Sequence, residues 1–344
     1  MNIKKIGLSA LAGSLAMVSA NAVELAVSGK TEVTYVNHDK ANTGNPFGMG
    51  NGITFTGSGD VNGMTATYTA VIQDGGGANS NTSEVFASSS LMLDMGDMGT
   101  IGFDQGVGEF GVSTIDDKTP YAYEEIWTNI GSGNGLRAAG GTNVVGYKNS
   151  IAGVNISLEI DPGHTNNSTV GGNGDGFSTG AGTTDSGYNF AITSADLYEG
   201  MNVGIGYGNE EHADDPVADN NYSDESFSTA FVTYAYGAAT LGYQMSEAYG
   251  GSVGTSSNEV TIYGISYSIN ENLAVSYTDL DNDYTLGTLS TGVAGAVSSS
   301  TKGIGASYTM GSAAVRVLMT DASNSGGVAN SNDEHMEVSL MLAF

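Results

Sequence analysis

Apolar and polar residues alternate along this chain from residue 24 to its last residue, and this alternation restricts the folds open to it. The apolar face of the first run consists of Leu25, Val27, Val33 and Tyr35. The last run repeats the pattern with Met336, Val338, Leu340, Leu342 and Phe344. Because successive side chains of a β-strand point to opposite faces, both ends of the chain are predicted to be two-faced strands.

Further alternating runs bring the prediction to about sixteen strands. They lie near residues 51–60, 63–73, 84–95, 98–104, 142–149, 152–161, 186–194, 200–208, 226–236, 238–247, 258–269, 272–280, 302–310 and 312–320. The connections alternate strictly in length. Short ones lie at residues 60–63, 96–99, 149–153, 194–200, 237, 269–272 and 311. Short turns at one end and long loops at the other predict an antiparallel transmembrane β-barrel.

Composition narrows the alternatives. The 52 glycines and few prolines would suit a disordered secreted chain, but 18 tyrosines in short alternating runs argue against disorder. The absence of cysteine excludes a disulfide scaffold and a thiolate metal site. Alternation alone would also fit a soluble sandwich, whereas strands of roughly 10 residues and closure of the sheet favour the barrel.

The first 22 residues are predicted to be an export signal. Lys4 and Lys5 give a positive start, residues 6–18 form an uncharged apolar run, and Ala20-Asn21-Ala22 is a small-x-small cleavage pattern. The apolar run is shorter than the roughly 20 residues that a membrane-spanning helix needs. We therefore expect a signal peptide at 1–22 and a barrel at 23–344.

The chain is strongly acidic. Its formal net charge is −28, and loss of Lys4 and Lys5 would leave seven basic residues against 37 acidic ones, or −30. Phosphate binding requires clustered Lys and Arg, so nucleic acid is not expected as a partner.

Signatures of enzymes and metal sites are weak, and we expect no enzyme activity. Asp185-Ser186-Gly187 lies at a loop-to-strand junction without a suitably placed histidine. The four histidines, His38, His164, His212 and His335, are far apart and are predicted to lie in loops, without a pair at ligand spacing. A glycine-rich stretch at 171–177 resembles one turn of a calcium-binding repeat but occurs once.

The chain resembles the Gram-negative general porins, especially those of alphaproteobacteria. The resemblance is carried by Ser19-Ala20-Asn21-Ala22, by Gly29 and Thr31 in the opening strand, by the segment 99–103, and by the ending Leu342-Ala343-Phe344. It implies a 16-stranded barrel of the outer membrane, usually a homotrimer, that passes ions and small hydrophilic solutes passively. It further implies that Phe344 is recognised by the barrel assembly machinery.

The family also implies that the third long loop folds into the barrel and narrows the pore. Here that loop runs from Asp104 to Gly141 and is the longest connection. Its predicted constriction residues are Glu109, Asp116, Asp117, Glu124, Glu125 and Arg137. A basic wall opposite the loop is predicted at Lys30, Lys148 and Arg316. Carboxylates that line a pore attract cations, so the sequence predicts a cation-preferring channel.

A second acidic loop follows near residue 209. Glu210, Glu211, Asp214 and Asp215 could hold a structural Ca²⁺ or bridge to lipopolysaccharide, although an ordinary solvated acidic loop explains them better. Apart from such a cation, no cofactor is expected. Two other functions stay open at this point: a substrate-selective porin, and an exported β-rich adhesin or surface protein without channel activity.

Overall fold

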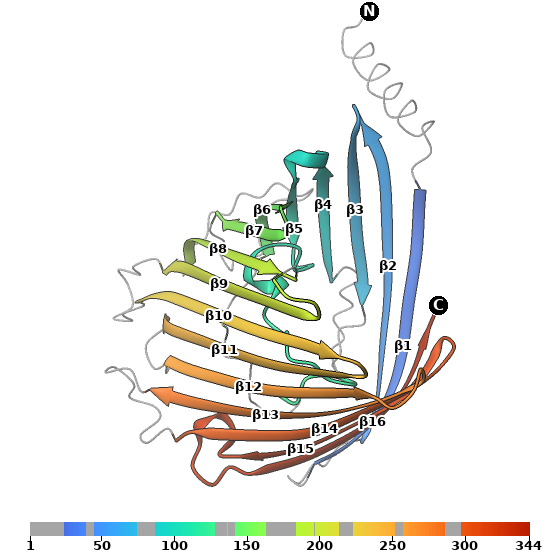
Figure 1. Cartoon of the computed structure of the whole chain (residues 1–344), viewed down its shortest axis with the longest axis vertical. Coiled ribbons are helices and arrows are strands. Elements are labelled where there is room, and N and C mark those ends of the chain that lie inside the picture. The colour runs from blue at the N-terminus through green and yellow to red at the C-terminus, as the bar shows by residue number, and fades with distance from the viewer. Residues whose placement is uncertain are drawn as a thin grey trace, which may run out of the picture.

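The computed structural model describes residues 24–38, 45–73, 87–127, 136, 142–162, 184–195, 197–212, 223–251, 257–285 and 297–344. Within these residues sixteen antiparallel strands pair in chain order, and β1 also pairs with β16, which closes the sheet into a barrel (Figure 1). The predicted barrel is confirmed. The predicted signal segment, 1–22, lies outside the described residues.

The strands are β1 (Glu24–His38), β2 (Phe47–Val61), β3 (Met64–Gln73), β4 (Ser88–Asp94), β5 (Thr100–Gln105), β6 (Thr142–Ile151), β7 (Val154–Asp161), β8 (Thr184–Ser194), β9 (Met201–His212), β10 (Ser223–Tyr236), β11 (Ala239–Gly251), β12 (Ser257–Ser268), β13 (Leu273–Thr285), β14 (Ser299–Met310), β15 (Ala313–Ser323) and β16 (Asp333–Ala343). Three short 3-10 turns accompany them: η1 (Gly96–Met98), η2 (Gly111–Thr114) and η3 (Ser325–Gly327). In the described part of the chain, no helix has the length and hydropathy to cross a membrane.

The predicted short connections all appear, at one end of the barrel. The turn from β2 to β3 shows why they are short: Asn62 and Gly63 both have positive φ, 54° and 82°. Two residues of this kind form the tight turn that matches the twist of paired strands. The opposite end of the barrel carries the long connections, as the sequence predicted.

The two faces of the sheet differ as the alternation predicted. Large apolar side chains project outward and are exposed, for example Leu25 at 65% and Ile304 at 58%. The intervening residues face the lumen and are largely polar, as in a barrel whose outer band contacts lipid. The inner face also carries several apolar residues, and these are buried by a loop that enters the barrel.

Backbone hydrogen bonds continue the seam between β1 and β16 to the last residue. The N–H of Gly29 donates to the carbonyl of Phe344 over 2.7 Å, and the N–H of Phe344 donates back over 2.9 Å. The Phe344 ring covers Gly29 so closely that a Cβ at this position would lie within 3.0 Å of it. Phe344 therefore occupies space that only glycine leaves open.

Candidate functional site

The third long loop turns into the barrel directly after β5. The side chain of Asp104 fixes the turn, because its carboxylate accepts hydrogen bonds from the N–H groups of Val107 and Glu109, both over 2.7 Å. Residues 106–127, here called the inner loop, then follow the inner wall past β7 to β15 and reach β16 and β1. The inner loop thus crosses the lumen side of most of the sheet.

Glycines on the inner wall make room for the inner loop. A Cβ built on any of four of them would lie within 3.0 Å of a loop atom; the pairs are Gly146 with Phe110, Gly206 with Val112, Gly242 with Pro120 and Gly303 with Ile126. Real Cβ atoms do not approach other atoms so closely, so larger residues would displace the loop. This glycine track holds the loop against the wall.

Hydrogen bonds fix the inner loop to the same wall. Four loop N–H groups donate to side-chain oxygens of the barrel over 2.8 to 2.9 Å: Gly111 to Ser157, Val112 to Asn189, Lys118 to Gln244, and Ala122 to Ser276. Gln244 is fully buried and also donates to the carbonyl of Asp116 over 2.9 Å. The wall therefore satisfies loop backbone groups that would otherwise be buried without partners.

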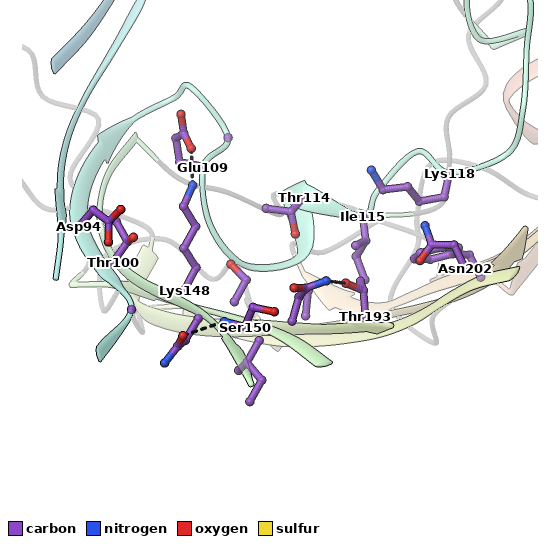
Figure 2. Close-up of a pocket in the computed structure, with 18 of the residues that line it drawn as sticks. Asp94, Thr100, Glu109, Thr114, Ile115, Lys118, Lys148, Ser150, Thr193 and Asn202 are labelled. Carbon is purple, nitrogen blue, oxygen red and sulfur yellow. Dashed lines mark hydrogen bonds and ion pairs between the residues drawn. The ribbon is translucent and has the colours of Figure 1, made fainter. Parts of the chain in front are cut away.

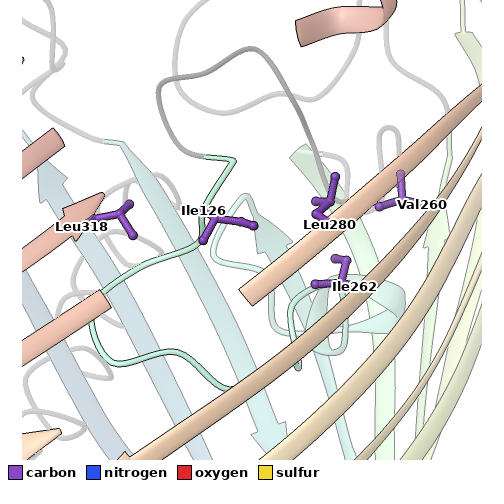
Figure 3. Packing of buried hydrophobic residues seen from close by; sticks show 5 residues of the cluster. All are labelled: Ile126, Val260, Ile262, Leu280 and Leu318. Atoms are coloured by element: carbon purple, nitrogen blue, oxygen red, sulfur yellow. The ribbon is translucent and has the colours of Figure 1, made fainter. Parts of the chain in front are cut away.

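The far end of the described loop docks by apolar contact. Ile126 is 2% exposed and packs among four buried residues of β12, β13 and β15 (Figure 3): Val260, Ile262, Leu280 and Leu318. Tyr123 and Trp127 pack against the same cluster. Burial of one such side chain contributes about 1.5–3 kcal/mol, enough to hold this end of the loop in place.

Tyr123 connects the loop to the barrel seam. Its hydroxyl lies 2.5 Å from a carboxylate oxygen of Glu337 on β16 and 3.1 Å from one of Glu32 on β1. The guanidinium carbon of Arg316, on β15, lies 4.6 Å from the Tyr123 ring centroid, and Arg316 forms an ion pair with Glu32 at 2.5 Å. We call this group the Tyr123 latch: Tyr123, Glu32, Arg316 and Glu337.

Two of the predicted constriction acids share a tyrosine. The Tyr121 hydroxyl lies 2.8 Å from Asp117 and 3.3 Å from Glu125. Burial and the neighbouring Glu125 carboxylate raise the pKa of Asp117 to about 8. Burial also raises the pKa of Asp116. Near neutral pH a large fraction of Asp117 is therefore protonated.

Glu124 lies between these acids and the latch. Burial raises its pKa to about 8, and the charges of Glu337, Glu125 and Glu32 act in the same direction against the opposing effect of Arg316. The loop thus brings Asp116, Asp117, Glu124 and Glu125 to one stretch of the inner wall. Glu109 lies apart from them at the start of the loop.

The predicted basic residues have separate surroundings. Lys148 forms an ion pair with Glu109 of the loop at 2.7 Å (Figure 2), and Arg316 belongs to the latch. Lys30 is exposed on β1, on the same face as Glu32. Arg137 lies outside the described residues. Lys148 and Arg316 are thus each in contact with a carboxylate at close range.

A cavity of about 770 Å³ lies between the start of the inner loop and the short-turn end of the barrel (Figure 2). Charged and amide side chains line it, among them Glu109, Lys118, Lys148, Asn155 and Asn202. The lumen on this side of the loop is therefore polar.

The acids proposed for a divalent cation diverge. Glu210 and Glu211 are successive residues of β9 and so point to opposite faces; Glu210 is the register partner of Glu225 on β10. Asp214 and Asp215 lie outside the described residues. Among the residues that are described, no group of three or more His, Cys, Asp or Glu side chains is arranged to hold a metal ion.

The prediction that the histidines lie in loops is wrong for the three that the structure describes, and two of these are not far apart. His38 ends β1 and His335 lies in β16, where they are register partners with ring centroids 4.6 Å apart. Closure of the barrel brings the two ends of the chain together, and sequence separation conceals this. His212 ends β9, and His164 lies outside the described residues.

Sequence reasoning also missed the latch and its acceptors. Glu337 was not singled out, and Gln244 gave no signal, because their roles depend on contacts with a loop more than 100 residues away. The sequence signal that could have indicated this docking is the apolar and aromatic stretch from Tyr121 to Trp127.

Comparisons with known proteins agree with this architecture. A family model described as Gram-negative porin matches residues 7–297. Among solved structures, OmpF of Salmonella typhi in complex with daunomycin has a TM-score of 0.67 at 15% identity and covers 94% of this chain and 99% of its own. An anion-selective porin from Comamonas acidovorans has a TM-score of 0.63 at 15% identity, covering 94% and 100%. No curated protein sequence matches the chain.

Proposed function

The chain belongs to the Gram-negative porin family, and from this we propose that it forms a water-filled outer-membrane channel through which ions and small hydrophilic solutes diffuse, with a preference for cations. The observation that carries the proposal is the inner loop, which is held in the lumen by the glycine track, by hydrogen bonds and by the Ile126 cluster. A non-enzymatic channel agrees with family membership.

Cation preference follows from the charges on the loop and the wall. Asp116, Asp117, Glu124 and Glu125 lie on one stretch of loop, whereas Lys148 and Arg316 are each compensated by a carboxylate. Carboxylates beside a low-dielectric wall raise the local concentration of cations. An anion-selective porin has the same fold at 15% identity, so the side chains and not the fold must decide selectivity.

Several further properties belong to the same proposal. Residues 1–22 would direct export and be removed, leaving the barrel at 23–344. Phe344 would be read by the barrel assembly machinery, and its two-way pairing with Gly29 supports a role for the terminal strand in closure. The barrel would assemble as a homotrimer among outer-membrane lipid and lipopolysaccharide. The channel would require no cofactor. A structural Ca²⁺ at the loop after β9 would brace that loop and would not be needed for conduction.

The test is reconstitution of the detergent-purified protein. We expect stepwise conductance in planar bilayers, and we expect liposomes that contain the protein to swell in small neutral sugars and to swell more slowly as the sugar grows. Folding of each sample is checked by heat-modifiable migration on a gel. Folded, inserted protein that neither conducts nor admits sugars would overturn the proposal and favour an adhesin or structural barrel.

A further inference from the structure

The His38–His335 pair lies on the inner face of the β1–β16 seam and takes no part in the function proposed above. The two rings are 4.6 Å apart between centroids, and their side chains are 14% and 0% exposed. Within the described part of the chain, neither ring nitrogen of His335 has a hydrogen-bond partner. A buried imidazole in this position is favoured in its neutral form, because a charge would lack water and the Glu337 carboxylate, at 3.9 Å, is beyond hydrogen-bond distance.

Two carboxylates of β16 lie within reach of the pair. Asp333 has an oxygen 3.5 Å from Nδ1 of His38, and Glu337 has one 3.9 Å from Nε2 of His335. The other charged or titratable side chains on the inner face of this wall include Lys30 and Glu32 of β1 and Arg316 of β15, and Tyr123 and Glu124 of the inner loop lie beside them. The wall thus offers an acceptor to each imidazole once it is protonated.

Glu337 links the histidine pair to the loop. It is the carboxylate that accepts the hydrogen bond of Tyr123 at 2.5 Å, and it lies two residues from His335 on the same face of β16. The docked end of the loop lies two strands from His335: a Cβ on Gly303 of β14 would touch both Ile126 and Thr320, and Thr320 of β15 is the register partner of His335. A change of charge on His335 would therefore act on the Tyr123–Glu337 hydrogen bond and, through Thr320, on the wall against which Ile126 packs.

We propose that the His38–His335 pair is a proton-operated switch for the inner loop: on acidification a second proton enters the pair, His335 draws Glu337 away from Tyr123, and the loop end at residues 123–127 leaves the wall. The inference rests on the channel function proposed above. Release admits water to the imidazolium, whose burial is unfavourable while the loop is docked. Repulsion between the two protonated imidazoles also favours release of the loop. The ion pair between Asp333 and His38 reduces this repulsion.

The pH range in which histidine titrates differs from that of the loop acids. Histidine ordinarily titrates near pH 6.5, whereas Asp117 and Glu124 have a pKa of about 8 and are already largely protonated below pH 7. In the docked loop these two carboxyl groups change little as pH falls from 7, and they favour docking, so release on acidification has to exceed their contribution.

The test uses single-channel recordings of the full protein between pH 7.5 and 4.5. We expect a second conductance level to appear on acidification, with the ratio of released to docked time rising by up to about tenfold per pH unit for a one-proton switch. His335→Gln and His38→Gln should remove this step. His212→Gln, at the end of β9, should keep it. Equal conductance at pH 7.5 shows that each variant is folded.

A disulfide between the loop and the wall tests whether release of the loop causes the second conductance level. A Cβ on Gly303 would lie 3.1 Å from Cβ of Ile126, so a small shift brings Ile126→Cys and Gly303→Cys to the 3.5–4.5 Å that a disulfide requires. The oxidised double variant should lose the acid step, and reduction should restore it. A step that persists in His335→Gln, that persists in the oxidised variant, or that the unsubstituted protein does not show would overturn the switch, while conductance at pH 7.5 would leave the channel function intact.

Discussion

The hydroxyl of Tyr121 donates a hydrogen bond to the carboxylate of Asp117 over 2.8 Å. The same hydroxyl lies 3.3 Å from Glu125, so one phenol lies between two acids of the inner loop. Two carboxyl groups held this close do not both ionise easily, and burial adds to the effect. The charge that the loop presents to passing ions should therefore depend on pH in the neutral to alkaline range.

The first prediction concerns this pH dependence. Asp117 and Glu124 have a pKa of about 8, so both gain negative charge as pH rises from 6.5 to 9. The cation-to-anion permeability ratio, obtained from the reversal potential, should increase by at least about twofold over this range. Asp117→Asn with Glu124→Gln should flatten the curve. A ratio that is independent of pH in the unsubstituted protein would contradict this view of the loop acids.

Docking of the inner loop should weaken as pH rises, whereas cation preference should increase. A carboxyl group with a raised pKa in the docked state contributes fully below its ordinary value and loses that contribution as pH rises through about 8. The Ile126→Cys, Gly303→Cys pair should therefore form its disulfide less completely at pH 9 than at pH 6.5 under a redox buffer adjusted for thiol ionisation. A control pair of cysteines introduced opposite each other on two paired strands corrects for thiol ionisation. Equal yields after correction would contradict the prediction.

The glycine track predicts a steric effect. Gly303→Val places a side chain where Ile126 lies and should displace the loop end, at a cost of about 1.5–3 kcal/mol from lost apolar burial. We expect larger single-channel conductance and faster proteolysis of the loop. Gly50→Val is the matched control, because a Cβ on Gly50 meets no atom within 4 Å. Conductance and proteolysis unchanged in Gly303→Val would show that the loop is not held there.

The latch predicts a difference between two tyrosines. Tyr123→Phe keeps the ring against Arg316 but removes its hydrogen bonds to Glu337 and Glu32, and loss of a hydrogen bond to a charged group costs about 1.5–3 kcal/mol. We expect more frequent conductance sublevels at neutral pH. Tyr121→Phe removes a hydroxyl that contacts Asp117 and Glu125 of the loop itself. This change should alter ion selectivity and should have little effect on the frequency of conductance sublevels. Identical recordings from both variants would count against the latch.

The seam predicts an effect on stability. Gly29→Val would force the Phe344 ring off β1 and should lower the temperature at which the folded band disappears in heated gel samples. Gly50→Val again serves as the control. If Gly29→Val has the same unfolding temperature as the unsubstituted protein, the ring does not contribute to closure.

Much of the fold was predictable because its signals are local. The period of two and the alternation of short and long connections gave the strands and the barrel, since both depend on neighbouring residues. Strand ends were harder: β13 continues through Asp281-Asn282-Asp283 to Thr285, a stretch whose polar composition resembles a loop. Its backbone is nevertheless paired with β12, so neighbouring strands and not local preference extend it.

The site was predictable only in part. The sequence placed five constriction acids on the third long loop, and the structure gathers four of them on one stretch of wall, while Glu109 lies apart with Lys148. The partners of Lys148 and Arg316, the latch and the His38–His335 pair depend on contacts between distant segments. One sequence contains no record of such contacts, because each arises from how the loop runs inside the closed barrel.

The most direct test of the account is the reversal potential across a tenfold KCl gradient at pH 8.5, where the loop acids are ionised. We predict cation preference in the unsubstituted protein and a marked loss of it when Asp116, Asp117, Glu124 and Glu125 become amides. A control with amides at the exposed outward residues Glu211, Asp281, Asp321 and Glu334 should keep the preference. Anion preference in the unsubstituted protein, or equal potentials in the two amide variants, would contradict the central claim that the inner loop sets the selectivity of this channel.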